Sequence, residues 1–266
     1  MINIVVFGDE SGIPNIMETI NQYDELRVRA IVYSKGRIAA KDVARQEALK
    51  IHCEYWEQPS AGDKTYRSFC ERVQNLSADY GVCFSYDRII KKEILEAFPQ
   101  GIYNLHGALL PKYRGGNVLQ WVLINGEEKT GVTMHKMVER VDAGPIVIQR
   151  EVQIAKDDTA VSLREKQKRV AKEILKDFFV AIADHRLTLI PQNEAEATHF
   201  RKRKPEDGEF SWEDNPEKIY NLIRALVLPW PGARFYHEGK LHIIDQFMPF
   251  DKVVKLREKY LASDIK

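Results

Sequence analysis

The sequence lacks any apolar run that approaches the about 20 residues needed to span a bilayer. Its first residues carry no basic segment of the kind that opens a targeting signal. It also lacks an excess of charge, because 40 Lys and Arg residues balance 39 Asp and Glu residues. No whole-protein field attracts nucleic acid or a membrane surface, so we expect neither as a partner and expect any anion binding to be local.

Cysteine is also scarce. The three cysteines, Cys53, Cys70 and Cys83, are odd in number and widely spaced. This pattern fits neither a disulfide framework nor a CxxC metal site, and it predicts a reduced, cytoplasmic protein.

Two common motifs are missing. Gly8 and Gly12 follow the first predicted strand, but a third glycine and a ribose-binding carboxylate are absent, so a plain strand-to-helix turn is favoured over a dinucleotide site. No Ser or Cys lies in a GxSxG context, which disfavours a covalent acyl-enzyme.

What the sequence does contain is an alternation of short apolar strands and amphipathic helices. The predicted strands are Ile2–Phe7, Val28–Tyr33, Ile51–Glu54, Gly81–Ser85 and Ile102–His106, and helices are predicted between them. This order predicts an α/β fold with a Rossmann-like, mostly parallel sheet flanked by helices.

The pattern changes towards the C-terminus. Two strands at 131–138 and 146–154 and a long helix to about Asp184 precede a polar link at 192–205. A helix starting at Pro216, a β-hairpin at 234–245 and an amphipathic tail follow. We therefore predict a catalytic domain at 1–194 and a smaller C-terminal α+β subdomain at 195–266.

The segment from Asn104 to Gly116, NLHGALLPKYRGG, stands at the end of a predicted strand, where open α/β sheets bind ligands. Asn104 and His106 point to one side because side chains in a strand repeat with period two. Lys112 and Arg114 add positive charge nearby, which suits an anionic substrate.

A carboxamide, an imidazole and the carboxylate of Asp142 suit acyl transfer through an oxyanion without a protein nucleophile. Taken alone, a histidine at a strand end such as His106 is more often a structural group. Asp142 alone could equally be a turn residue, since it precedes Ala-Gly. A metal site from His106, His135 and Asp142 is disfavoured, because strand alternation does not aim His135 at His106.

Several motifs resemble the 10-formyltetrahydrofolate-dependent formyltransferases, and most closely the sugar N-formyltransferases, including the formyltransferase domain of the bifunctional lipid A aminoarabinose-modifying enzyme. The motifs are FSYDRII from Phe84, NLHGALLPKYRG from Asn104, GVT from Gly131, DAG from Asp142, RKPEDG from Arg203 and PWPGA from Pro229.

The resemblance implies the formyltransferase fold, 10-formyltetrahydrofolate as co-substrate and no metal. It implies Asn104, His106 and Asp142 as the catalytic triad. It places the folate pterin against Tyr86, Arg88, Ile89, Ile90 and the Asp142 loop. The anionic acceptor would meet Lys112, Arg114, Lys204 and Trp230.

The acceptor expected from the resemblance is the amine of a dTDP- or UDP-linked amino sugar, as in lipopolysaccharide or O-antigen biosynthesis, and the expected assembly is a homodimer. A methionyl-tRNA formyltransferase would carry a further C-terminal β-barrel, and a glycinamide ribonucleotide formyltransferase would end near the long helix. A formyltetrahydrofolate hydrolase would carry an N-terminal regulatory module. A non-catalytic folate or nucleotide-sugar binding module is the alternative from another class.

Overall fold

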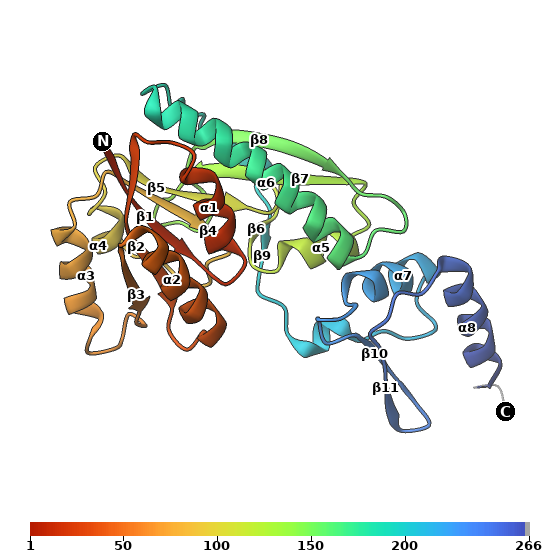
Figure 1. Cartoon of the computed structure of the whole chain (residues 1–266). Coiled ribbons are helices and arrows are strands. Elements are labelled where there is room, and N and C mark those ends of the chain that lie inside the picture. The colour runs from red at the N-terminus through yellow and green to blue at the C-terminus, as the bar shows by residue number, and fades with distance from the viewer. Residues whose placement is uncertain (264–266) are drawn as a thin grey trace. The chain divides into compact units, whose positions relative to one another are not determined.

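The computed structural model describes residues 1–263, which form two compact units, each made of three chain segments (Figure 1). The first unit contains Met1–His106, Val132–Arg150 and Val170–Glu194. The second contains Gly107–Gly131, Glu151–Arg169 and the chain from Ala195 onward. The residues predicted as a separate C-terminal subdomain therefore share their unit with two earlier segments.

A seven-stranded sheet dominates the fold, with the strand order β3-β2-β1-β4-β5-β7-β8. The pairs β3–β2, β2–β1, β1–β4 and β4–β5 are parallel, and β5–β7 is antiparallel. The strands are β1 (Ile2–Gly8), β2 (Leu26–Ser34), β3 (Glu54–Gln58), β4 (Tyr80–Phe84), β5 (Gly101–His106), β7 (Lys129–Lys136) and β8 (Ile146–Gln153). The predicted mostly parallel sheet is confirmed.

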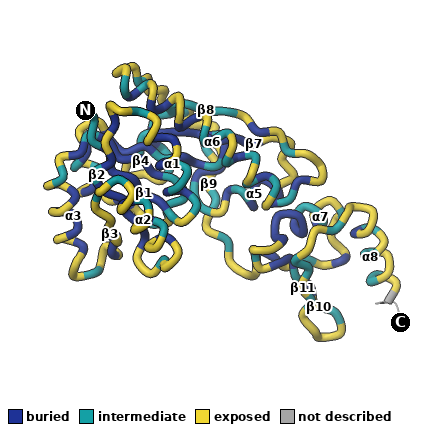
Figure 2. Tube along the Cα trace, viewed as in Figure 1, coloured by how far each residue is buried: buried dark blue, intermediate teal, exposed yellow. Residues whose placement is uncertain are grey.

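Helices cover both faces of this sheet because its inner strands are apolar on both sides. In β1, Ile4 to Phe7 are completely buried, and Figure 2 shows β1 and β4 dark blue. Apolar residues of α1 (Gly12–Ile20), α2 (Ile38–Ile51) and the later part of α6 (Ala160–Ala183) form a core cluster with one face. Residues of α3 (Tyr66–Asn75) and α4 (Lys92–Leu95) form a cluster with the other.

The strand predicted at Ile51–Glu54 was placed too early. Helix α2 continues to Ile51 because Ala40, Ala44 and Ala48 recur every four residues and are buried against the core. The helix ends where His52 adopts the left-handed conformation, with φ of 53°. Strand β3 starts only at Glu54.

The second unit contains helices α5 (Val118–Ile124), α7 (Pro216–Ala225) and α8 (Phe250–Ser263). A short parallel pair joins β6 (Arg114–Gly115) to β9 (His199–Phe200), and the predicted hairpin is present as β10 (Ala233–His237) and β11 (Lys240–Ile244). Trp212 is buried and stacks on Tyr260, with ring centroids 4.9 Å apart. The C-terminal helix is thus packed within its own unit.

Candidate active site

Asn104 and His106 occupy the carboxyl end of β5, on one face of the strand. The antiparallel neighbour β7 places His135 opposite Asn104, and Thr133 opposite His106. His106, Thr133 and His135 are all buried. The strand register, rather than a local motif, therefore brings a second imidazole into the site.

Asp142 reaches both imidazoles from the loop between β7 and β8. Its Oδ2 lies 3.5 Å from Nδ1 of His106, and its Oδ1 lies 3.4 Å from Nε2 of His135. The Asp142 side chain is only 11% exposed, so water screens the carboxylate little from these two rings. The three side chains predicted to act together do lie together in the structure.

His135 bonds to a second member of the predicted triad, because its Nε2 lies 3.3 Å from Nδ2 of Asn104. Its Nδ1 lies 3.2 Å from the carbonyl oxygen of Lys136, which can only accept a hydrogen bond. We therefore assign the proton of a neutral His135 to Nδ1, which leaves Nε2 to accept from Asn104. The other N–H of the Asn104 carboxamide remains available to a reacting oxygen.

Sequence reasoning considered His135 only as a metal ligand and set it aside. Its true position follows from the pairing of β5 with β7, which strand alternation alone does not reveal. Among residues 1–263 no group of three or more His, Cys, Asp and Glu side chains is arranged to hold a metal ion.

The segment that follows β4 is fixed from the neighbouring strand ends. Tyr86 donates from its hydroxyl to Oε1 of Gln58 at 2.7 Å, and Nε2 of Gln58 donates to the carbonyl of Ile89 at 3.1 Å. Burial raises the pKa of Tyr86 well above its usual range, so the hydroxyl stays protonated as the donor. Arg88 donates to the carbonyl of Lys35 at 2.8 Å.

This bonding leaves two neighbouring isoleucines in opposite situations. The Ile89 side chain is 70% exposed, whereas Ile90 is buried. The segment thus presents backbone and one apolar side chain on a rigid support. Gln58 was not expected from the sequence to support it.

The first strand-to-helix turn is closed by its own carboxylate. Oδ1 of Asp9 accepts from the backbone N–H of Ser11 at 2.9 Å, from that of Gly12 at 2.8 Å and from the Ser11 hydroxyl at 2.8 Å. A phosphate bound at the start of a helix would need such N–H groups. The turn is therefore not available as an anion site, in agreement with the missing dinucleotide motif.

The residues predicted to meet the acceptor lie in the second unit, in different environments. Lys112 and Lys204 are exposed and Trp230 is partly exposed, whereas Arg114 is completely buried. Tyr113 beside Arg114 stacks on Phe200 with ring centroids 4.6 Å apart. A ligand can reach Lys112, Lys204 and Trp230 directly, but direct contact with Arg114 requires its cover to open.

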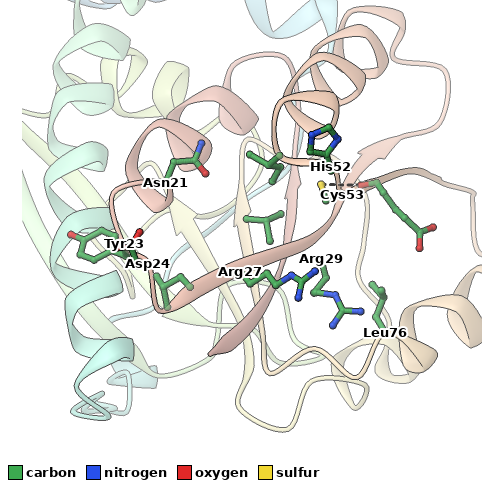
Figure 3. A pocket seen from close by; sticks show the side chains of 12 residues that line it. Asn21, Tyr23, Asp24, Arg27, Arg29, His52, Cys53 and Leu76 are labelled. Carbon is green, nitrogen blue, oxygen red and sulfur yellow. Dashed lines mark hydrogen bonds between the residues drawn. The ribbon is translucent and has the colours of Figure 1, made fainter.

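A separate cavity of about 410 Å³ lies at the amino ends of β2 and β3. Figure 3 shows Arg27 and Arg29 beside each other in it. The residues that end α1, α2 and α3, namely Asn21, His52 and Leu76, also line it. Helix C-termini carry partial negative charge, which the arginines offset, so this cavity needs no ligand to explain its basic residues.

No helix within residues 1–263 combines the length and apolar character needed to span a membrane.

Comparison with known proteins gives matches along most of the chain. A family model described as Formyl transferase matches residues 2–178, and one described as Formyl transferase, C-terminal domain, matches residues 202–252.

Solved structures share the fold at low sequence identity. A 4-N formyltransferase from Francisella tularensis is 18% identical, with 93% of this chain and 98% of that chain covered and a TM-score of 0.75. An N-formyltransferase from Helicobacter canadensis, solved with folinic acid and dTDP-3-aminofucose, is 18% identical. The match covers 90% of this chain and 85% of that chain, with a TM-score of 0.67. The methionyl-tRNA formyltransferase from Clostridium thermocellum is 23% identical. The match covers 92% of this chain and 100% of that chain, with a TM-score of 0.63.

Proposed function

This chain belongs to the formyl transferase family, and from that premise we propose that it transfers a formyl group from 10-formyltetrahydrofolate to the amine of a nucleotide-linked amino sugar. The observation that carries the proposal is the cluster at the carboxyl end of β5, where the buried His106 and the partly buried Asn104 meet the partly buried Asp142 of the β7–β8 loop. A carboxamide, an imidazole and a carboxylate supply a hydrogen-bond donor, a proton carrier and a charge to stabilise it.

In the proposed reaction the lone pair of the acceptor amine forms a bond to the formyl carbon, and the formyl oxygen becomes negatively charged. Asn104 donates an N–H to that oxygen as the charge develops. His106 takes the proton that the attacking nitrogen loses, and Asp142 stabilises the resulting imidazolium. His106 then delivers the proton to the departing folate nitrogen as its bond to the formyl carbon breaks.

The folate would lie against the segment from Tyr86 to Ile90, with backbone groups and the exposed side chain of Ile89 facing the pterin. Arg88 and the Asp142 loop would complete its surroundings. The proposed step requires no metal ion, because Asn104 supplies the hydrogen bond that stabilises the formyl oxygen.

The nucleotide-sugar acceptor is supported by the Helicobacter canadensis structure, which binds folinic acid and dTDP-3-aminofucose. In this chain Lys112 and Lys204 would contact the diphosphate and Trp230 would stack on the base. Arg114 would support this surface from its buried position. The products would serve lipopolysaccharide or O-antigen synthesis in the cytoplasm.

The second candidate is a methionyl-tRNA formyltransferase, which the match to the Clostridium thermocellum enzyme favours. A tRNA partner needs a basic surface directed at phosphates. This chain has a net charge of +1, so we rank the nucleotide sugar first.

The experiment offers 10-formyltetrahydrofolate with a panel of dTDP- and UDP-amino sugars and with methionyl-tRNA, and product masses are measured. We expect a mass gain of one formyl group on an amino sugar. Formylation of the tRNA alone would replace the first candidate with the second. Binding of folate and sugar without product would instead show a non-catalytic module.

The same assay tests Asp142. We expect Asp142→Asn to lower kcat on the order of 100-fold, because losing such a group removes about 3 kcal/mol of transition-state stabilisation. Affinity for 5-formyltetrahydrofolate should change much less. An unchanged kcat would remove Asp142 from the mechanism.

A homodimer is also proposed. The outward face of the β10–β11 hairpin carries Tyr236, Leu241 and Ile243, which are 63%, 46% and 54% exposed. Tyr236 pairs with Leu241 across the strands, and Ile243 lies on the same face two residues beyond Leu241, opposite Arg234. Burying such a surface against a second copy would remove it from water.

A further inference from the structure

We infer that Gln192 is a positioning residue for Asp142, which acts by clamping the loop that carries this carboxylate. The inference rests on the proposed function only in the role it gives Asp142. Gln192 belongs to neither the motifs nor the strands of the site, and it lies in the segment that follows α6. Its amide nevertheless reaches the loop directly.

The backbone of the Asp142 loop has a specific conformation. Asp142 has φ of 51°, in the left-handed region that Asp adopts more readily than most residues other than glycine. A displaced loop would move both carboxylate oxygens away from His106 and His135, which lie 3.5 and 3.4 Å from them. Shifts of about 1 Å at a reacting group can cost up to a hundredfold in rate.

The inner side of the loop is held by β7. The N–H of Lys136 donates to the carbonyl of Pro145 at 2.9 Å, which closes the base of the loop. Gly144 sits directly on the strand end, since a Cβ atom there would lie 1.8 Å from the carbonyl oxygen of Lys136. These contacts fix the base of the loop.

Gln192 contacts the loop from the segment that follows α6. Its Nε2 donates to the carbonyl of Asp142 at 2.8 Å and to that of Gly144 at 2.6 Å. A primary amide has two N–H donors, so one side chain satisfies both carbonyls on either side of Ala143. Glutamate at this position would point a carboxylate oxygen, which only accepts hydrogen bonds, at the two carbonyl oxygens. It would also add negative charge beside Asp142.

The backbone around Gln192 is itself anchored. Ile190 and Ile146 exchange two backbone hydrogen bonds of 2.8 Å each. The amide of Gln192 therefore starts from a fixed point. Glu194, in the same segment, forms only an exposed ion pair of 2.7 Å with Arg140, which contributes little, so Glu194 is a matched control.

The test compares Gln192→Leu, Gln192→Glu and Glu194→Gln in the formyl transfer assay. We expect Gln192→Leu to lower kcat about tenfold, Gln192→Glu to lower it further, and Glu194→Gln to leave it unchanged. In the Asp142→Asn background, Gln192→Leu should change kcat less than twofold, because a residue that acts through Asp142 has nothing left to position. A wild-type kcat in Gln192→Leu, or a full tenfold loss in both backgrounds, would overturn the inference.

Hydrogen exchange of the amides at 138–145 provides a readout that does not depend on activity. Gln192→Leu should speed exchange there and leave exchange in β1 unchanged, whereas Glu194→Gln should match the wild-type protein. If neither the wild-type protein nor any variant formylates an acceptor, the proposed function fails. Hydrogen exchange alone then tests whether Gln192 holds the Asp142 loop in place. Unchanged exchange in the loop would then rule it out.

Discussion

His135 links two of the side chains that the sequence analysis proposed as catalytic. It accepts from Nδ2 of Asn104 at 3.3 Å and lies 3.4 Å from Asp142, while its own proton is held by the Lys136 carbonyl. An imidazole with a fixed tautomer can set the plane of the Asn104 carboxamide. The direction of the N–H that we propose to stabilise the formyl oxygen then depends on His135.

Replacing His135 by Phe should therefore lower kcat about tenfold, since the freed carboxamide no longer points one N–H at the formyl oxygen. His135→Gln keeps an acceptor oxygen at a similar distance and should recover part of the loss. Steady-state kinetics measure both variants, and their melting temperatures show whether the fold is kept. Equal losses in the two variants at equal stability would contradict the orienting role.

Single residues show where sequence reasoning succeeds and where it stops. Asn104 and His106 were predicted to face one side because period two is a local property of a strand. His135 was not placed, since its position depends on the antiparallel register of β5 and β7. Gln192 gave no signal at all, because it bonds to a carbonyl 50 positions away.

At the scale of elements, the turn from β1 into α1 depends on a close approach between backbones. A Cβ atom at Gly12 would lie 1.9 Å from the carbonyl oxygen of Phe84 at the end of β4. Asp9 caps the same turn with three hydrogen bonds. The helix can therefore begin directly beside the neighbouring strand.

Gly12→Ala should lower the free energy of unfolding by about 3 kcal/mol, because backbone atoms cannot give way as a flexible side chain can. Urea denaturation of the variant measures the loss. Gly62→Ala is the matched control, since a Cβ atom there meets nothing within 4 Å. Equal stability of the two variants would show that α1 can shift to accept the methyl group.

Element type was more predictable than element position. Buried apolar runs identified β1, β2, β4 and β5, and the Glu238-Gly239 turn identified the hairpin. The third strand was misplaced because the predicted run began at Ile51, which is the last residue of α2, and β3 starts only at Glu54. Packing of the α2 alanines against the core decided the boundary, and no local propensity carries that information.

For the whole molecule, the proposed dimer makes a direct prediction. Light scattering after size exclusion should give twice the chain mass of 30.8 kDa. Replacing both Tyr236 and Ile243 by Lys should yield the monomer, because charge on this face opposes its burial. Lysine at the exposed Val161 and Val180 of α6 provides the control. A monomeric wild-type protein would remove the proposal.

The order of strands and helices was sufficient to predict the α/β architecture, since a parallel sheet needs a crossover between consecutive strands. It was not sufficient to predict how the chain divides. The segments 107–131 and 151–169 belong with the chain after Ala195, although they precede it by many residues. Such grouping depends on long-range contacts that no periodicity encodes.

The interleaving of the two units sets an order of events during synthesis. The first unit cannot be completed until Glu194 has left the ribosome, because its last segment supplies part of its core. Until then α5 and the start of α6 have been synthesised, but α7 and the residues after it, which belong to the same unit, have not. A nascent chain therefore exposes apolar faces of these helices until α7 and the elements that follow it have been synthesised.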